Sequence, residues 1–268
     1  MSKKPPAHDP LTEAVSNLAK PVYKDAAKPL AKQLGRAGGT VGSFVNTVLA
    51  PLALTAYAWE LSEPKIKEVI AKKINEKLGD IQESKLVAPS QRILVPAVQS
   101  FVHATEEEDI ADMFANLLAS SMNVDKTTNV HPAFVQVINN LTADEAKVLK
   151  VFAKENPLPI VDVQLHFAAG GYKVILPNFS VIGGMGIFER PDLMPSYLTH
   201  LCQLGLLEIP SGGVTLNDES RYAPIGEHPE IQTLLTTLQN SGNTIELQNK
   251  VVSITAFGRQ FISVTLNN

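Results

Sequence analysis

The chain has 268 residues, of which 44% are hydrophobic and 19% are charged. This length suits one large domain or two smaller ones, and the apolar content excludes a globally disordered protein. The single cysteine, Cys202, excludes an internal disulfide and indicates a reducing compartment. The polar, Pro-rich start predicts no secretory signal peptide, so we expect a cytoplasmic protein.

The charges are distributed unevenly along the chain. Residues 1–80 carry 12 Lys and Arg against 8 Asp and Glu, residues 81–155 carry 6 against 10, and residues 156–268 carry 5 against 9. The basic N-terminal part predicts an anionic partner, such as lipid headgroups or nucleic acid. The acidic remainder argues against broad contact with a phosphate backbone.

Residues 1–36 are expected to form a basic amphipathic lead-in. Apolar residues recur at helical spacing from Leu11 to Leu34, and Pro21 and Pro29 divide the pattern into short helices. Cations recur at every fourth position and make a stripe along one side of a helix: Lys20, Lys24, Lys28, Lys32 and Arg36. Such a stripe favours contact with an anionic lipid surface.

Residues 37–62 form a Gly- and Ala-rich segment that is expected to meet a membrane. Its first 23 residues carry no charge and would span roughly 34 Å as one helix, about the thickness of a bilayer's hydrocarbon core. The expected contacts are apolar and interfacial aromatic side chains: Phe44, Leu49, Leu52, Tyr57 and Trp59. Because Asn46 and Pro51 make the run only marginally apolar, burial between helices is an equal alternative.

Residues 63–140 are expected to form a central helical domain. Apolar spacing predicts helices over 63–80 and 106–122. Thr105 with Glu108 predicts a capping box for the second of these, and the acids at 106–109 favour the positive end of its dipole. Pro132 is expected to open a further helix that ends near Leu141.

Residues 141–268 are expected to form a winged-helix-like domain. Thr142 with Glu145 predicts a capping box, and helices are expected over 192–204 and 229–239. Short strands are expected at 206–209, at 214–216 and as two separate strands within 245–254, followed by a helix that Thr255 caps. The predicted fold class is therefore mainly α (α+β), with N-terminal and central helices before a domain with short strands.

No common catalytic, metal or cofactor motif is present. The glycines at 35–42 and 183–186 lack the Lys-Ser/Thr of a phosphate-binding loop, and no two histidines lie three or four residues apart. Cys202 has the setting of a packed thiol. We therefore expect no enzyme activity, no metal and no cofactor, although a site built from scattered residues around His131 and the acids at 106–109 is a remaining alternative.

DNA binding is not favoured by the charges of the expected winged-helix domain. The helix over 192–204 contains no Lys or Arg, and the nearby cations are Arg190 and Arg221. Recognition of DNA depends on Lys and Arg contacts to phosphate. We therefore expect this domain to bind a protein partner or to mediate dimerisation.

The segment from Glu106 to Phe152 carries a characteristic set of residues. It includes Asp109, Met113, Phe114, Asn116, Leu117, Leu118, His131, Pro132 and Phe134, and closes with the six residues at 141–146. With the segments at 201–208 and 254–261, it resembles the abortive infection alpha family of bacterial phage-resistance proteins. The resemblance covers 85–268 well, and it implies phage defence without an agreed enzymatic activity or catalytic residue set.

The leading hypothesis is a non-enzymatic bacterial antiviral defence protein. It would bind a protein partner, which a phage could encode, and associate peripherally with the inner membrane through its N-terminal region. The alternative is a soluble winged-helix regulator or adaptor that binds DNA or protein. The glycine spacing at 35–42 also permits a homo-oligomer.

Overall fold

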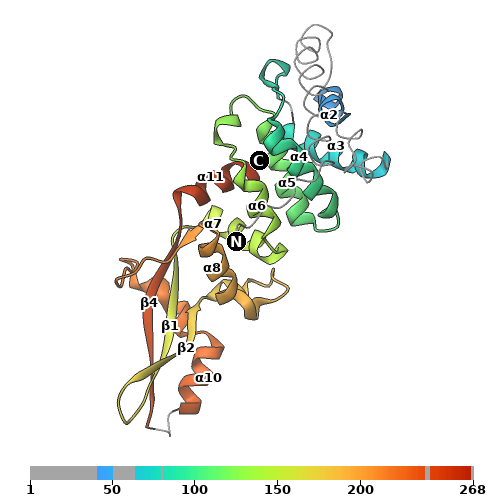
Figure 1. The fold of residues 1–268 in the computed structure, drawn as a ribbon. Helices are drawn as coiled ribbons and strands as arrows, with labels where there is room; N and C mark the ends of the chain where they lie inside the picture. The colour runs from blue at the N-terminus through green and yellow to red at the C-terminus, as the bar shows by residue number, and fades with distance from the viewer. Residues whose placement is uncertain (1–40, 51–63, 80, 239–241, 267–268) are drawn as a thin grey trace, which may run out of the picture. The chain divides into compact units, whose positions relative to one another are not determined.

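The computed structural model describes residues 41–50, 64–79, 81–238 and 242–266 (Figure 1). The chain divides into two compact units. The first comprises the described residues up to 140 together with 263–266, and the second comprises residues 141–262. The predicted membrane contacts Lys20, Lys24, Lys28, Lys32, Arg36, Leu52, Tyr57 and Trp59 lie outside the described residues.

The first unit is organised around α5 (Glu108–Ser121), in which 11 of 14 residues are buried. Helices α3 (Pro64–Leu78), α4 (Gln91–His103) and α6 (Ala133–Asn139) all contact it (Figure 1). A helix that is apolar on most of its circumference has to be enclosed in this way. Phe101 and Phe114 stack with ring centroids 6.2 Å apart where α4 meets α5.

A carboxylate on α5 connects this helix to α3. Asp112 accepts hydrogen bonds from Lys73 at 2.6 Å and Lys77 at 3.0 Å, which lie one helical turn apart on α3. Burial raises the pKa of Asp112, but the hydrogen bonds and charges of the two lysines outweigh that effect and hold it below its ordinary value. The ionised carboxylate therefore joins the two helices.

The described part of the uncharged run is a short helix, α2 (Val41–Leu49), which packs against α3. Phe44, Val45, Val48 and Leu49 are buried there. Membrane contact by Phe44 and Leu49 would therefore require α2 to leave α3. Among the described residues, none of the helices combines the length and the apolar character needed to cross a bilayer.

The second unit contains a four-stranded antiparallel sheet in the order β2-β1-β4-β3. The strands are β1 (Leu158–His166), β2 (Tyr172–Phe179), β3 (Leu207–Glu208) and β4 (Thr244–Ile254). β4 pairs along the whole length of β1. Val161, Val163 and Phe179 form a core with Tyr222 of η7 (Glu219–Tyr222), Ile225 of α9 (Ala223–Gly226) and Ile231 of α10 (Pro229–Leu238). α10 lies against the sheet (Figure 1).

The start of α11 (Ala256–Thr265) is attached to the turn before β3. Gly205 has a φ of +73°, a left-handed conformation that ends α8 (Met194–Gln203). The Thr255 hydroxyl donates to the Gly205 carbonyl at 2.6 Å and accepts from the Gly258 N–H at 2.8 Å. Thr255 therefore caps α11, as the sequence predicts, and joins it to the turn.

The predicted class, mainly helical with short strands, is confirmed, but the winged-helix assignment is not. β1 and β2 separate α7 (Ala143–Lys154) from α8, and the two strands expected within 245–254 form one continuous strand, β4. Residues 214–216 are irregular and form no strand. The reason is strand pairing: β1 pairs with β4 without interruption from Thr244 to Val252, across the break that the sequence pattern suggested.

One of the two predicted capping boxes is wrong. α5 begins at Glu108, and its N-cap, Glu107, makes no side-chain capping bond. Thr105 instead donates its hydroxyl to the Val102 carbonyl at 3.1 Å, at the end of the preceding helix. Thr105 directly follows Ala104, the C-cap of α4, and the Glu107 N–H donates to the Ala104 carbonyl at 3.0 Å, so the chain is still turning at Thr105.

Gly258 provides a test of the junction between α11 and the turn. A Cβ at this position would lie 2.0 Å from the Leu206 carbonyl oxygen and 2.9 Å from Ile254 Cγ2. We expect G258A to lower the free energy of unfolding by about 3 kcal/mol, because backbone cannot move aside as a flexible side chain can. Urea denaturation measures this, with G184A as the control, since nothing lies within 4 Å of a Cβ there. Equal stability of the two variants would contradict the close approach.

Candidate functional site

Two consecutive acids, Asp144 and Glu145, lie in the first turn of α7. Thr142 is its N-cap, and the predicted capping box is confirmed: the Glu145 N–H donates to Thr142 Oγ1 at 3.2 Å, and the Thr142 N–H donates to Glu145 Oε2 at 2.8 Å. Negative side chains are stabilised at this end of a helix. We call Asp144 and Glu145 the acid pair.

Asp144 is 5% exposed and accepts four hydrogen bonds. The donors are the backbone N–H groups of Glu189 and Arg190, at 3.1 and 2.9 Å, Lys147 Nζ at 3.1 Å and the Tyr197 hydroxyl at 3.3 Å. Burial raises the pKa of Asp144, but the two backbone N–H groups and Lys147 hold it below its ordinary value. Burial and the neighbouring Asp144 charge raise the pKa of Tyr197.

Glu145 is 2% exposed and joins α7 to α8. Its Oε2 accepts from the Thr142 N–H and hydroxyl, and its Oε1 lies 2.6 Å from Nδ1 of His200 on α8. The oxygens of both acids are thus bonded to parts of the fold. A general base needs an oxygen within reach of a substrate, so this arrangement suits a structural role.

The acid pair positions the segment that follows β2. This segment includes η5 (Val181–Met185) and reaches Glu189 and Arg190, whose N–H groups Asp144 holds. Beside α7 it forms a hollow of about 570 Å³, here called the α7 groove. The groove is lined by Lys147, Lys150, Val151, Lys154, Glu155, Met185 and Ile187. Met185 and Ile187 are 54% and 47% exposed.

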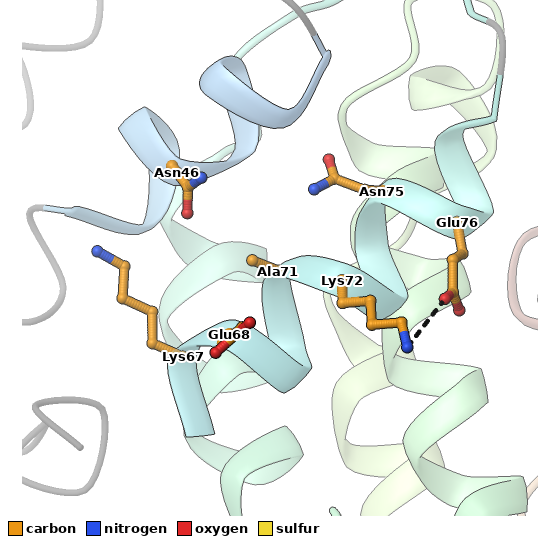
Figure 2. A pocket seen from close by; sticks show the side chains of 7 residues that line it. All are labelled: Asn46, Lys67, Glu68, Ala71, Lys72, Asn75 and Glu76. Atoms are coloured by element: carbon orange, nitrogen blue, oxygen red, sulfur yellow. Dashed lines mark ion pairs between the residues drawn. The ribbon is translucent and has the colours of Figure 1, made fainter. Parts of the chain in front are cut away.

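A second hollow, of about 520 Å³, lies between α2 and α3 in the first unit. Its lining residues are Asn46, Lys67, Glu68, Ala71, Lys72, Asn75 and Glu76, and Figure 2 shows Asn46 and Asn75 pointing into the space between the two helices. Lys72 pairs with Glu76 at 3.9 Å. Because lysines and glutamates alternate along its wall, this hollow has no net preference for an anion or a cation.

Six of the nine residues of the predicted family motif lie in the core of the first unit. Met113, Phe114, Leu117, Leu118 and Phe134 are buried. Asn116 is buried and donates to the Thr265 carbonyl at 2.9 Å. His131 accepts from the Ala133 N–H at 3.1 Å, and Pro132 is the N-cap of α6. Asp109 lies in the first turn of α5.

The remaining candidates of the sequence are His131, the acids at 106–109 and Cys202. Among the described residues, no three His, Cys, Asp or Glu side chains are grouped to hold a metal ion. Glu106, Glu107 and Glu108 are exposed at the start of α5. Cys202 is half-buried rather than fully packed, and burial, with a smaller effect of the Glu208 charge, raises the pKa of its thiol.

Sequence reasoning did not identify the acid pair, His200 or the α7 groove as a site. The capping box was visible, but the contacts of Asp144 depend on residues 45 to 53 positions away. One signal was available: Lys147, Lys150 and Lys154 share a face at helical spacing on α7. The partners Met185 and Ile187 could only be found once the segment after β2 was placed.

Comparison with known proteins identifies one family. The family model described as abortive infection alpha matches residues 62–265, which is most of the chain. No curated protein matches the chain, and no solved structure matches it.

The lowered pKa of Asp144 predicts how the second unit responds to pH. Its contribution to stability is complete above the unfolded value of about 3.9 and is lost as pH falls through the lower folded value. We expect D144N to lower the free energy of unfolding by about 2 kcal/mol at pH 7, because an amide cannot replace an acceptor of four bonds.

Amide hydrogen exchange measured at pH 7 and pH 3 tests this locally. At pH 7, D144N should exchange faster than wild type at the amides of Glu189 and Arg190, which donate to Asp144. The difference should shrink at pH 3. D192N is the control, since Asp192 is exposed and forms its ion pair with the neighbouring Arg190. Unchanged exchange at both amides in D144N would show that Asp144 does not hold this segment.

Proposed function

The chain belongs to the abortive infection alpha family, and we propose that it is a non-enzymatic antiviral defence protein that acts by binding a protein partner. Family membership suggests abortive-infection-type defence. The observation that supports a binding role is that the buried acid pair lies beside the exposed α7 groove. The buried acids are occupied by structural bonds. Lys150, Lys154, Met185 and Ile187 line the groove beside them and are exposed.

A protein partner is favoured over DNA by the charges around α8. If the second unit works as a winged helix, α8 would be the recognition helix, and it has no Lys or Arg. Arg190 is paired with Asp192 at 2.7 Å, and Arg221 with Glu155 at 2.7 Å. Both arginines are thus neutralised within the second unit, whereas DNA binding requires cations that are available to phosphates.

Peripheral contact with the inner membrane is the second part of the proposal. The basic stripe of Lys20, Lys24, Lys28, Lys32 and Arg36 would contribute about 1 kcal/mol per cation at an anionic surface. α2 uses its apolar side chains against α3, so the stripe is the simpler membrane element. Insertion of residues 37–59 would be a further step that separates α2 from α3.

Charge reversal in the α7 groove tests the binding role in cells. We expect K150E/K154E, in the full-length chain, to abolish protection, because both lysines are exposed and line the groove. The measurement is the efficiency of plating of a phage panel on bacteria that express each variant. K65E/K173E is the control, with the same change in charge at exposed lysines outside the groove. Full protection by K150E/K154E would refute the groove as the binding site.

Neutralising the basic stripe tests the membrane part. We expect the full-length chain with all five cations of the stripe changed to Gln to leave the membrane fraction and to lose protection. Substitution is preferable to deletion of 1–62, because deletion would also remove α2 and uncover the apolar face of α3. The readouts are cell fractionation, with and without infection, and plating. Membrane association that survives the five substitutions would disprove a role for the stripe.

A further inference from the structure

The lysines of the α7 groove form a short cationic ladder. Lys150 and Lys154 follow Lys147 by three and seven residues, so the three lysines share one face of α7 over a rise of about 10 Å. Lys147 is partly used by its ion pair with Asp144 at 3.1 Å. Lys154 is exposed and forms no ion pair with the residues that the structure describes. The ladder therefore offers positive charge to an incoming group.

The ladder stands out because its surroundings are acidic. Residues 141–262 carry 8 Lys and Arg against 12 Asp and Glu. Of the remaining cations, Arg190, Arg221 and Lys250 are paired with Asp192, Glu155 and Asp162. An extended polyanion, such as a membrane surface or a nucleic acid, would meet repulsion beyond the groove. A short acidic segment would meet the three lysines and one carboxylate, Glu155, which is already paired with Arg221 at 2.7 Å.

The opposite wall of the groove is apolar. Met185 and Ile187 are large side chains that are about half exposed, and Val151 continues the apolar surface on α7. Single exposed apolar residues are ordinary, but three that line one hollow make a surface whose burial would be favourable. Methionine also adapts its shape to different partners. The wall therefore suits aliphatic or aromatic side chains.

The groove is held in place before any partner arrives. Asp144 bonds both Lys147 and the backbone of Glu189 and Arg190, which follow Met185 and Ile187 closely along the chain. Both walls are thus tied to one buried carboxylate. A prepared site of this kind loses little conformational freedom on binding. A volume of about 570 Å³ lies within the usual range of binding pockets.

We propose that the α7 groove binds a short protein segment in which acidic side chains alternate with apolar ones. The acidic side chains would pair with the lysine ladder, and the apolar ones would cover Met185 and Ile187. A ladder of about 10 Å matches two turns of helix, or about three residues of extended chain. This inference rests on the proposed protein-binding function, and it specifies the chemistry of the partner.

Fluorescence anisotropy with synthetic peptides tests the partner chemistry. The probe is a fluorescein-labelled 12-residue peptide of Glu, Leu and Asn in helical amphipathic order, titrated with the full-length protein. Matched probes replace every Glu with Gln, or every Leu with Asn. We expect the Glu and Leu probe to bind at least about tenfold more tightly than either matched probe, with an affinity that falls as salt rises. Equal binding of the Gln probe would overturn the proposal.

Variants of the protein locate the binding. K150E/K154E and M185S/I187S should each weaken the Glu and Leu probe by at least about tenfold, and K65E/K173E by less than about twofold. Circular dichroism and the exchange of the Glu189 amide show that each variant keeps its fold. The proposal would be overturned if the probe did not bind at all. It would also be overturned if K150E/K154E kept its affinity for the probe and lost only its binding to vesicles that contain phosphatidylglycerol. If K150E/K154E lost phage protection without any change in probe affinity, the acidic segment would be refuted while the proposed function stood.

Discussion

The second unit depends on one buried carboxylate. Asp144 accepts four hydrogen bonds from three parts of the chain: its own helix, the segment after β2, and α8. An ionised group at 5% exposure is stable only when its lone pairs are satisfied, so these contacts have to form together. Glu145, the next residue, adds the bond to His200. The polar start of α7 thus determines where α8 and the walls of the groove lie.

The first unit follows a different rule, because its centre is mainly apolar and the buried polar side chains of Asn116 and Ser120 bond backbone carbonyls. α5 buries 11 of its 14 residues, and its partly exposed Asp112 is held by two lysines of α3. The residues that carry the family resemblance are concentrated here and in the caps of α7 and α11. Their roles are packing and capping: Phe114 fills the core, Asn116 bonds the Thr265 carbonyl, and Thr255 starts α11. A motif of this kind describes a fold, and the reaction or partner has to be sought elsewhere on the surface.

The proposed function depends on a buried polar cluster, the acid pair, and on the exposed surface beside it. The acid pair is buried and fully bonded, whereas Lys150, Lys154, Met185 and Ile187 are exposed beside it. Catalytic carboxylates are arranged in the opposite way, with an oxygen open towards a cavity. A defence protein that responds to infection requires a surface that can be occupied or released, and the α7 groove has the charge and the apolar wall for that purpose.

Local rules determined much of this protein from its sequence. Apolar periodicity identified α5 and α8, and the hydroxyl groups of Thr142 and Thr255 marked the starts of α7 and α11, because a cap depends only on residues within one turn. The same rules failed at Thr105, where the chain is still turning, and at 245–254, where pairing with β1 makes one strand of two apparent ones. Only the tertiary structure could decide the contacts of Asp144 with Glu189, Arg190 and Tyr197, and hence the place of Met185 beside the lysines. Those contacts join residues far apart in the chain, and which of them form depends on packing and desolvation that no local pattern records.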